Sequence, residues 1–394
     1  MITEKLYERD SYLQEFDATV LSCAPQGENY GVVLDRTAFF CEGGGQYGDE
    51  GAIRCGEDWV AVLDTVPQGG EVTHITDGPL PVGASVHGIV HFETRYRNMQ
   101  NHSGEHVVSG IIHARHGFDN VGFHLGRDYV SLDISGPLTP SEVARIEELA
   151  NEVVWRNLPI TVSFPTAEEL AALRYRSKKD LSGEVRIVTV GDCDACACCA
   201  PLVRRTGEIG MIKLLNPINY KGGTRMFLQC GSSALADYNE KQSRIEAISH
   251  LLSAKQTDVV QAVERVKSEL GEARQEIAAL RRALAGERLA ALNSNGGVAL
   301  FFEEMLDVSS LRILVNGAVE RTGGTAAAFL GNDTDGYLYM IASREMPMRP
   351  VAAALREAFG AKGGGSDAMI QGNVTADRAA LTAWVNGYFK EEKA

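Results

Sequence analysis

Two histidines four residues apart, His102 and His106, are the residues of this sequence best suited to metal chemistry. Residues 95–115 are predicted as a helix, and positions i and i+4 of a helix share one face, so both imidazoles can reach one ion. Further along the chain stands a cluster of cysteines, Cys193, Cys196, Cys198 and Cys199. Nitrogen and sulfur ligands favour zinc over magnesium or calcium. We therefore predict a zinc site that draws on both segments.

Three kinds of zinc or thiol site compete at this stage. Glu105 completes the pattern H-x-x-E-H of the inverted zinc peptidases, in which the glutamate is the general base for zinc-bound water. A peptidase site takes a carboxylate as its third ligand, whereas this chain offers thiolates. A structural zinc closed by four protein ligands remains open. A redox role for the pair Cys193 and Cys196 is disfavoured, because the βαβ setting of thioredoxin-like proteins is missing.

The length and net charge of the chain limit which class of protein it can belong to. A chain of 394 residues is too long for one core, so two or three domains are expected. The net charge of −14 argues against a general nucleic-acid coat protein, although it permits local basic surfaces. No apolar run approaches the roughly 18 residues of a membrane span, and the charged N-terminus is no secretory signal. We expect a cytoplasmic protein without membrane contact.

The pattern of helices and strands expected along the chain indicates a multidomain α+β fold. Residues 1–90 alternate apolar and polar positions between Gly- and Pro-rich turns, which indicates a small β-barrel. Residues 91–237 mix strands with the histidine-bearing helix and with a second helix, whose N-cap we assign to Ser141. This part forms the expected zinc domain.

Residues 238–294 are predicted as a helical, coiled-coil linker. Apolar residues step by fours and threes along a heptad seam, namely Val259, Val263, Val266, Leu270, Ala273, Ile277, Leu280 and Leu284. Such a seam must be buried against something, so a homodimer through this segment or the C-terminal domain is one expectation. Residues 295–394 are predicted as a separate α/β domain, in which we assign 311–315, 326–330 and 337–341 to strands.

Several segments together resemble one family. Residues 36–51 are similar to the Gly-Gly-Gln loop in the editing region of alanyl-tRNA synthetase, and residues 102–106 fall where that region has its HxxxH. Residues 198–210, CCAPLVRRTGEIG, resemble the family's C-x-x-x-H segment and the T-G-E-I-G that follows it. The glycines at 363–365 resemble the C-terminal DHH-associated domain. The chain thus resembles a free-standing alanyl-tRNA editing protein of the long AlaX type.

The resemblance implies a function and a ligand set. Such proteins hydrolyse the ester that joins a wrong amino acid, serine or glycine, to alanine tRNA. The resemblance implies zinc held by His102, His106 and Cys198, with a fourth ligand at position 202. This chain has Leu202 there, which cannot coordinate a metal, so Cys196, Cys199 or water is left for the fourth place. Leu202 also keeps open a non-catalytic alternative, a tRNA- or partner-binding protein with structural zinc.

The remaining site residues follow from the same segments. We predict Glu105 as a candidate base and Gln46 as a residue that hydrogen-bonds the substrate from the glycine-rich loop. Other predicted substrate contacts are the loop glycines and two hydroxyls, Gly44, Gly45, Ser103 and Thr206. A pocket that hydrogen-bonds the hydroxyl of serine would reject alanine, because alanine would leave its polar groups unpaired.

Overall fold

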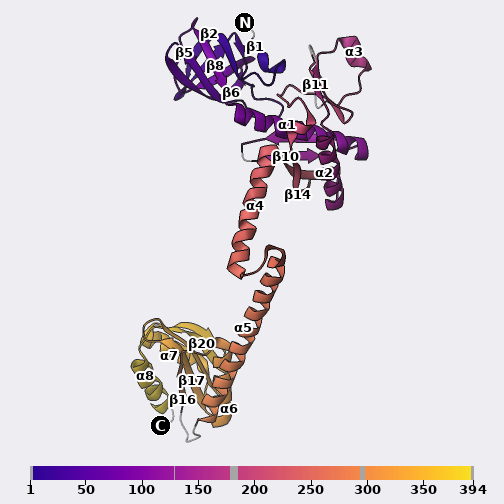
Figure 1. Ribbon diagram of the computed structural model, residues 1–394. Coiled ribbons are helices and arrows are strands. Elements are labelled where there is room, and N and C mark those ends of the chain that lie inside the picture. The colour runs from indigo at the N-terminus through magenta and orange to yellow at the C-terminus, as the bar shows by residue number, and fades with distance from the viewer. Residues whose placement is uncertain (1–2, 128, 178–184, 293–297, 392–394) are drawn as a thin grey trace. The chain divides into compact units, whose positions relative to one another are not determined.

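The computed structural model describes residues 3–127, 129–177, 185–292 and 298–391. It divides into two units, residues 1–246 and 247–394 (Figure 1). The expected multidomain α+β fold is confirmed. The finer division into four domains stays a prediction, and its boundary at residue 294 lies outside the described residues. In the described part of the chain, the helices are too short or too polar to cross a membrane.

A closed six-stranded barrel confirms the prediction for the N-terminal part. Its strands, in order around the barrel, are β2 (Glu15–Gln26), β3 (Asn29–Leu34), β7 (Glu71–Thr76), β6 (Asp58–Gln68), β5 (Gly51–Cys55) and β8 (Ser85–Val90). Alternate residues of β2, Phe16, Ala18 and Val20, point into the barrel core. Beside the barrel, β1 (Glu4–Lys5) pairs with β4 (Arg36–Thr37), and the glycine-rich loop runs from β4 to β5.

The second half of this unit is a sheet covered by two helices. The sheet order is β14 (Ile212–Tyr220), β15 (Gly223–Cys230), β10 (Val130–Ile134) and β9 (Asn120–Leu125). Helices α1 (Phe92–His116) and α2 (Pro140–Trp155) share a core with the buried residues of these strands. The predicted N-cap of α2 is wrong: Thr139 caps the helix in a capping box with Glu142, because Pro140 takes the first helical position.

A small three-stranded sheet completes the first unit and carries the cysteine cluster. Its strands are β11 (Ile160–Ser163), β12 (Ile187–Val190) and β13 (Asp194–Ala197), with α3 (Ala167–Ala172) between β11 and β12 in sequence. After β13 the chain passes through residues 198–205 to the short 3₁₀ helix η2 (Thr206–Ile209). Helix α1 contacts both β13 and η2, so the histidines and cysteines are brought to one place.

The predicted helical segment is confirmed as helical and consists of two helices. These are α4 (Gly231–Leu252) and α5 (Val259–Ala290), separated by a break that includes the short 3₁₀ helix η3 (Gln256–Asp258). Several residues of the predicted seam on α5 are exposed, namely Val263, Val266, Leu270, Ile277 and Leu280. The coiled coil and the pairing of two chains therefore stay predictions.

The second unit contains a five-stranded sheet with a core on each face. The sheet order is β16 (Ala299–Glu303), β17 (Thr325–Asn332), β18 (Gly336–Ser343), β20 (Met369–Val374) and β19 (Lys362–Gly365), and the helices are α6 (Val308–Thr322), α7 (Met348–Phe359) and α8 (Arg378–Glu391). The predicted strand at 311–315 is wrong, since these residues lie in α6. Asp307 caps that helix, and its buried residues repeat with helical spacing.

One buried histidine makes the barrel sensitive to acid. His74 on β7 is fully buried, with its Nδ1 3.0 Å from the carbonyl oxygen of Val32 and its Nε2 2.8 Å from Oγ1 of Thr37. Burial lowers the pKa of His74 to about 4, because the apolar interior disfavours the imidazolium. The neutral ring is therefore part of the folded barrel.

We expect His74 to lower the stability of the barrel as the pH falls from 6.5 towards 4. In this range the unfolded chain, whose histidine titrates near pH 6.5, binds more protons than the folded one. The loss between pH 7 and pH 5 is about 2 kcal/mol. Urea unfolding followed by tryptophan fluorescence should show this pH dependence reduced in His74→Gln and retained in His91→Gln, an exposed control. Equal pH dependence in all three proteins would contradict the assignment.

Candidate metal centre

The two histidines of α1 lie side by side in the interior. Both are buried, and their rings stack with centroids 5.6 Å apart and an interplanar angle of 21°. They are one helical turn apart, as the sequence predicts, on a helix whose residues 98–112 are buried. Two parallel rings on one face can offer their nitrogen atoms to a common ion.

Gln46 holds the first histidine in place. Nδ1 of His102 donates to Oε1 of Gln46 over 2.8 Å, which leaves Nε2 of His102 directed to Cys198, whose Sγ is 3.5 Å away. Gln46 is buried at the end of the glycine-rich loop. Its Oε1 thus fixes the tautomer and the orientation of His102, as residues behind metal-binding histidines do. From the sequence, Gln46 is predicted to hydrogen-bond the substrate. In the structure, Oε1 of Gln46 accepts a hydrogen bond from His102.

Asp194 and Arg176 hold the second histidine. Nδ1 of His106 is 3.0 Å from Oδ2 of Asp194, and Arg176 donates from Nε and Nη2 to both carboxylate oxygens at 2.7 Å each. Burial raises the pKa of Asp194, but the bonds from His106 and Arg176 outweigh it and hold the carboxylate ionised. Sequence reasoning missed both residues. The available signal was the aspartate between the two cysteines of C-D-A-C, directly after Cys193.

Cys198 completes a group of three donors. Nitrogen atoms of His102 and His106 and the sulfur of Cys198 all lie within 4.8 Å of one another. Burial would raise the pKa of the Cys198 thiol, but the two imidazoles beside it hold that pKa well below its ordinary range. Burial would likewise lower the pKa of His106, whereas Asp194 and Cys198 raise it well above the usual value. The site therefore favours a thiolate, the form that binds metals.

The donor set fits a zinc-like ion. Nε2 of His106 is buried and has no hydrogen-bond partner among the described residues, whereas Nδ1 is occupied by Asp194. A buried nitrogen without a partner costs free energy unless something binds it. Two imidazole nitrogens and one thiolate are ligands of a borderline-soft metal rather than of magnesium or calcium.

Residue 202, where the resemblance implies a fourth metal ligand, is a leucine and supplies no donor atom. Leu202 is buried in the core shared by α1 and α2, where it packs with apolar neighbours. Cys196, the predicted fourth ligand, belongs to a second group with His106 and Asp194. Burial raises its pKa to about 11, and its Sγ lies 3.6 Å from the carbonyl oxygen of Ala197. Cys199 is exposed.

Glu105 lies between the two histidines in sequence, and its Oε1 is hydrogen-bonded to α1 and β9. Its Oε1 accepts from Oγ of Ser109 at 2.6 Å and from Nδ2 of Asn120, which ties α1 to β9. This orientation follows from helix geometry, since neighbouring residues differ by about 100° around the axis. In this structure the carboxylate has a packing role, and its assignment as a base stays a prediction.

The other predicted substrate contacts are engaged elsewhere. Oγ of Ser103 accepts from the amide of Val203, and Oγ1 of Thr206 donates to Val153 and accepts from Leu158. Gly44 and Gly45 have φ values of +61° and +87°, which favour glycine. A Cβ on Gly45 would overlap the carbonyl group of Phe123 on β9. Gly45 thus lets the loop lie against β9.

Two amide groups next to the centre have unused donors. Nδ2 of Asn98 and Nε2 of Gln46 are buried and have no hydrogen-bond partner among the described residues. Oδ1 of Asn98 accepts from the hydroxyl of Tyr47 at 3.2 Å, so its amino group is the free end. Asn98 lies one turn before His102 on α1. Sequence reasoning missed it, because an asparagine inside a helix has no motif.

Comparisons with known proteins agree with this architecture. Residues 12–94 match the family model "tRNA synthetases class II (A)", and residues 185–242 match "Threonyl and Alanyl tRNA synthetase second additional domain". Alanyl-tRNA editing protein AlaX-L of Pyrococcus horikoshii is 28% identical over 388 residues, 95% of each chain. Aarsd1 of Mus musculus, also an alanyl-tRNA editing protein, is 27% identical over 99% of each chain. The alanine–tRNA ligase of Pyrobaculum neutrophilum is 31% identical over 95% of this chain and 43% of that enzyme.

The barrel, the HxxxH helix and the matched second additional domain define a chain related to the editing region of alanyl-tRNA synthetase. Its near full-length similarity to AlaX-L and Aarsd1 places it, more narrowly, in the family of long, free-standing alanyl-tRNA editing proteins. The predicted resemblance is confirmed.

We expect Asp194→Asn to weaken zinc binding by about 10- to 100-fold, the usual effect of a residue that orients a ligand from behind. Asp192→Asn is the matched control, since Asp192 lies two positions away and pairs with Arg156 on the surface. Competition with a chromogenic chelator measures both affinities. Equal affinities in the two variants would show that Asp194 does not support a bound metal.

Proposed function

We propose that this chain is a trans-acting hydrolase that removes a wrong amino acid, serine or glycine, from alanine tRNA at a zinc site. The observation that carries the proposal is the group of two buried histidines, His102 and His106, with the half-buried Cys198, in which both histidine Nδ1 atoms have hydrogen-bond partners. The names of the relatives supply the substrate class, alanyl-tRNA editing.

The number of protein ligands supports a catalytic rather than a structural zinc. Structural zinc sites are closed by four protein ligands, whereas catalytic sites hold three and keep one position open. Here Leu202 supplies no donor atom, and the group that contains both imidazoles has the thiol of Cys198 as its third member. Leu202, which in the sequence kept the non-catalytic alternative open, therefore favours an accessible ion.

In this proposal the ion would be held by His102, His106 and Cys198. A bound zinc ion would polarise a carbonyl, lower the pKa of water or anchor an amino group. Gln46, Asp194 and Arg176 keep the two imidazoles in the tautomer that directs Nε2 inward. The free amino groups of Asn98 and Gln46 would donate to oxygen atoms of the aminoacyl ester or its ribose, because both lack partners in the described structure.

The peptidase alternative has less support. It needs Glu105 beside zinc-bound water, whereas Oε1 of Glu105 accepts from Ser109 and Asn120. It also needs a carboxylate as third ligand, and the third donor grouped with the two histidines is the sulfur of Cys198. Neither observation is expected of a zinc peptidase.

We expect the protein to hydrolyse seryl- or glycyl-tRNA for alanine and to spare alanyl-tRNA. Removal of zinc by a chelator should abolish the reaction and added zinc should restore it. His102→Ala should reduce the rate to the uncatalysed background, because one of three ligands is lost. Cys199→Ala, which removes an exposed thiol, is the control that keeps activity. A folded, zinc-loaded protein without hydrolysis would establish the non-catalytic alternative.

We expect Asn98→Ala to lower kcat/KM by about 10-fold, the typical worth of one lost hydrogen bond to substrate. Zinc content should stay at the level of the parent protein, because Asn98 supports neither histidine. Rates with misacylated tRNA and zinc measured on the same preparation separate the two effects. An unchanged kcat/KM would mean that buried water, not substrate, satisfies this amide.

A further inference from the structure

The four-stranded sheet β14-β15-β10-β9 of the first unit packs against α1 and α2 with one face, and its other face lies opposite to these helices. Along β10 and β15 the buried residues point to the helices, whereas Ser131, Asp133, Arg225 and Phe227 alternate with them. A hollow of about 630 Å³ opens on this face. Its lining residues are His124, Tyr129, Ser131, Asn216, Arg225 and Phe227.

Aromatic rings gather around this hollow. The ring of Tyr129 lies 5.6 Å from that of His124 and 5.7 Å from that of Phe227, measured between centroids. Tyr129 is 52% exposed, which is unusual for a tyrosine that contacts two other rings. We call the group of His124, Tyr129, Tyr220, Arg225 and Phe227 the aromatic platform.

A guanidinium extends the platform and fixes its shape. The Cζ of Arg225 lies 3.7 Å from the centre of the Tyr220 ring, and its Nε and Nη2 donate to the two carboxylate oxygens of Asp133 at 2.6 and 2.7 Å. Asp133 thus holds the guanidinium over the ring of Tyr220. Flat aromatic and guanidinium surfaces are what unstacked nucleic-acid bases bind.

The charge of this face suits an anionic partner. The net charge of the whole chain is −14. On the platform, however, the negative charge of Asp133 is balanced by Arg225, and Lys221 adds a positive charge over the Tyr220 ring. A cation beside stacking surfaces is the combination by which proteins bind single-stranded nucleic acid.

The platform borders the metal centre through β9. Phe123 packs on His102, with ring centroids 4.9 Å apart, while His124, the next residue, lines the hollow on the other face. The glycine-rich loop runs along the same strand, since the amide of Leu125 donates to the carbonyl of Gly45 at 2.6 Å. A strand of nucleic acid that crosses the sheet therefore arrives beside the loop that holds His102.

We propose that the aromatic platform binds unpaired RNA by stacking bases on Tyr129 and Phe227. Given the proposed function, on which the identity of the RNA rests, the ligand is the unpaired acceptor end of tRNA, whose terminal ribose carries the ester. The platform binds the nucleotides that precede this ribose and positions the ester at the edge of β9.

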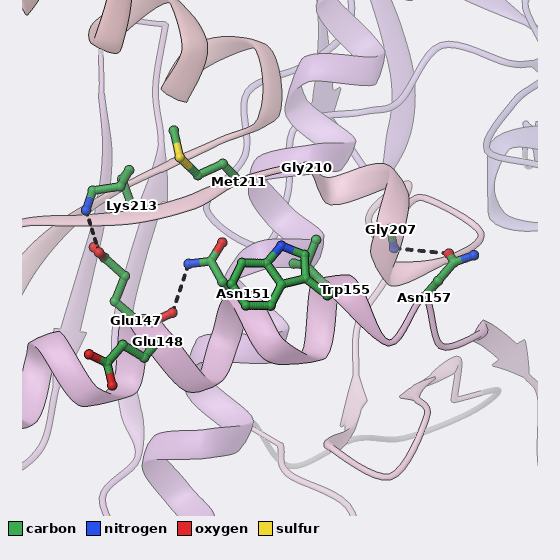
Figure 2. Close-up of a pocket in the computed structure, with 10 residues that line it drawn as sticks. Glu147, Glu148, Asn151, Trp155, Asn157, Gly207, Gly210, Met211 and Lys213 are labelled. Carbon is green, nitrogen blue, oxygen red and sulfur yellow. Dashed lines mark hydrogen bonds and ion pairs between the residues drawn. The ribbon is translucent and has the colours of Figure 1, made fainter.

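A second hollow with an exposed aromatic ring provides a contrast. This hollow, of about 650 Å³, is lined by Trp155 and Met211 together with Glu147 and Glu148 (Figure 2). Trp155 is 78% exposed. Lys213 is paired with Glu147, and Glu148 is paired with Arg145. The described lining of this hollow therefore offers a phosphate backbone no unpaired cation, which makes Trp155 a matched control.

The test measures binding of a labelled single-stranded oligoribonucleotide of about ten nucleotides to the full-length protein by fluorescence anisotropy. Tyr129→Ala and Phe227→Ala should each weaken binding by about 10-fold or more. Tyr129→Phe, which keeps the ring, and Trp155→Ala should bind like the parent protein. Thermal melting of each variant verifies that it is folded.

Several outcomes would overturn the proposal. These are unchanged affinity in a folded Tyr129→Ala, equal losses in Trp155→Ala, and duplex RNA that competes as well as single strands. A change of oligomeric state in Tyr129→Ala would assign the face to protein contacts instead. His102→Ala separates this proposal from the proposed function, since it should abolish hydrolysis and leave binding of the oligoribonucleotide unchanged.

Discussion

A buried ion pair between Arg95 and Asp49 joins the barrel to the helix that carries both histidines. Arg95 donates from Nε to Asp49 at 2.7 Å, and its other nitrogens donate to the carbonyl oxygens of Ala38 and Ser11. Both side chains are buried, and loss of either would leave an uncompensated charge at a cost of about 3–5 kcal/mol. The pair fixes the loop that holds Gln46 against α1, so the position of His102 depends on it.

The geometry of the candidate metal centre therefore depends on the residues that hydrogen-bond the two histidines as much as on the three donors themselves. Gln46 comes from the barrel side and Asp194 from β13, and each orients one histidine of the same helix. This arrangement explains how the site can lack a ligand at Leu202 and keep its geometry. The two imidazoles are held from outside by a carboxamide and by a carboxylate that a guanidinium anchors, so their placement does not require a fourth protein ligand.

The sequence predicted the elements well where periodicity was strong, and the site only partly. The HxxxH helix, the barrel and the α+β class follow from spacing and alternation. The apolar run at 311–315 is compatible with strand or helix, and the cap at Asp307 decided for helix. The roles of Gln46, Asp194 and Asn98 depend on contacts between residues 51 to 88 positions apart, which no local pattern encodes. Thr206 was predicted as a substrate contact because it lies in a family motif, but in the structure its hydroxyl bonds to the backbone of Val153 and Leu158.

The separation of the ligands along the chain has a consequence for biosynthesis. His102 and Cys198 are 96 positions apart, so on the ribosome the two imidazoles emerge well before the thiol. The barrel strands and α1 are fully synthesised by then, because they end at Val90 and His116. The nascent chain thus passes through a stage in which both imidazoles and Gln46, the partner of His102, are present, whereas Asp194 and the sulfur have yet to be synthesised. Metal acquired during that stage would be held by nitrogen alone, and β13 would close the centre only as translation proceeds.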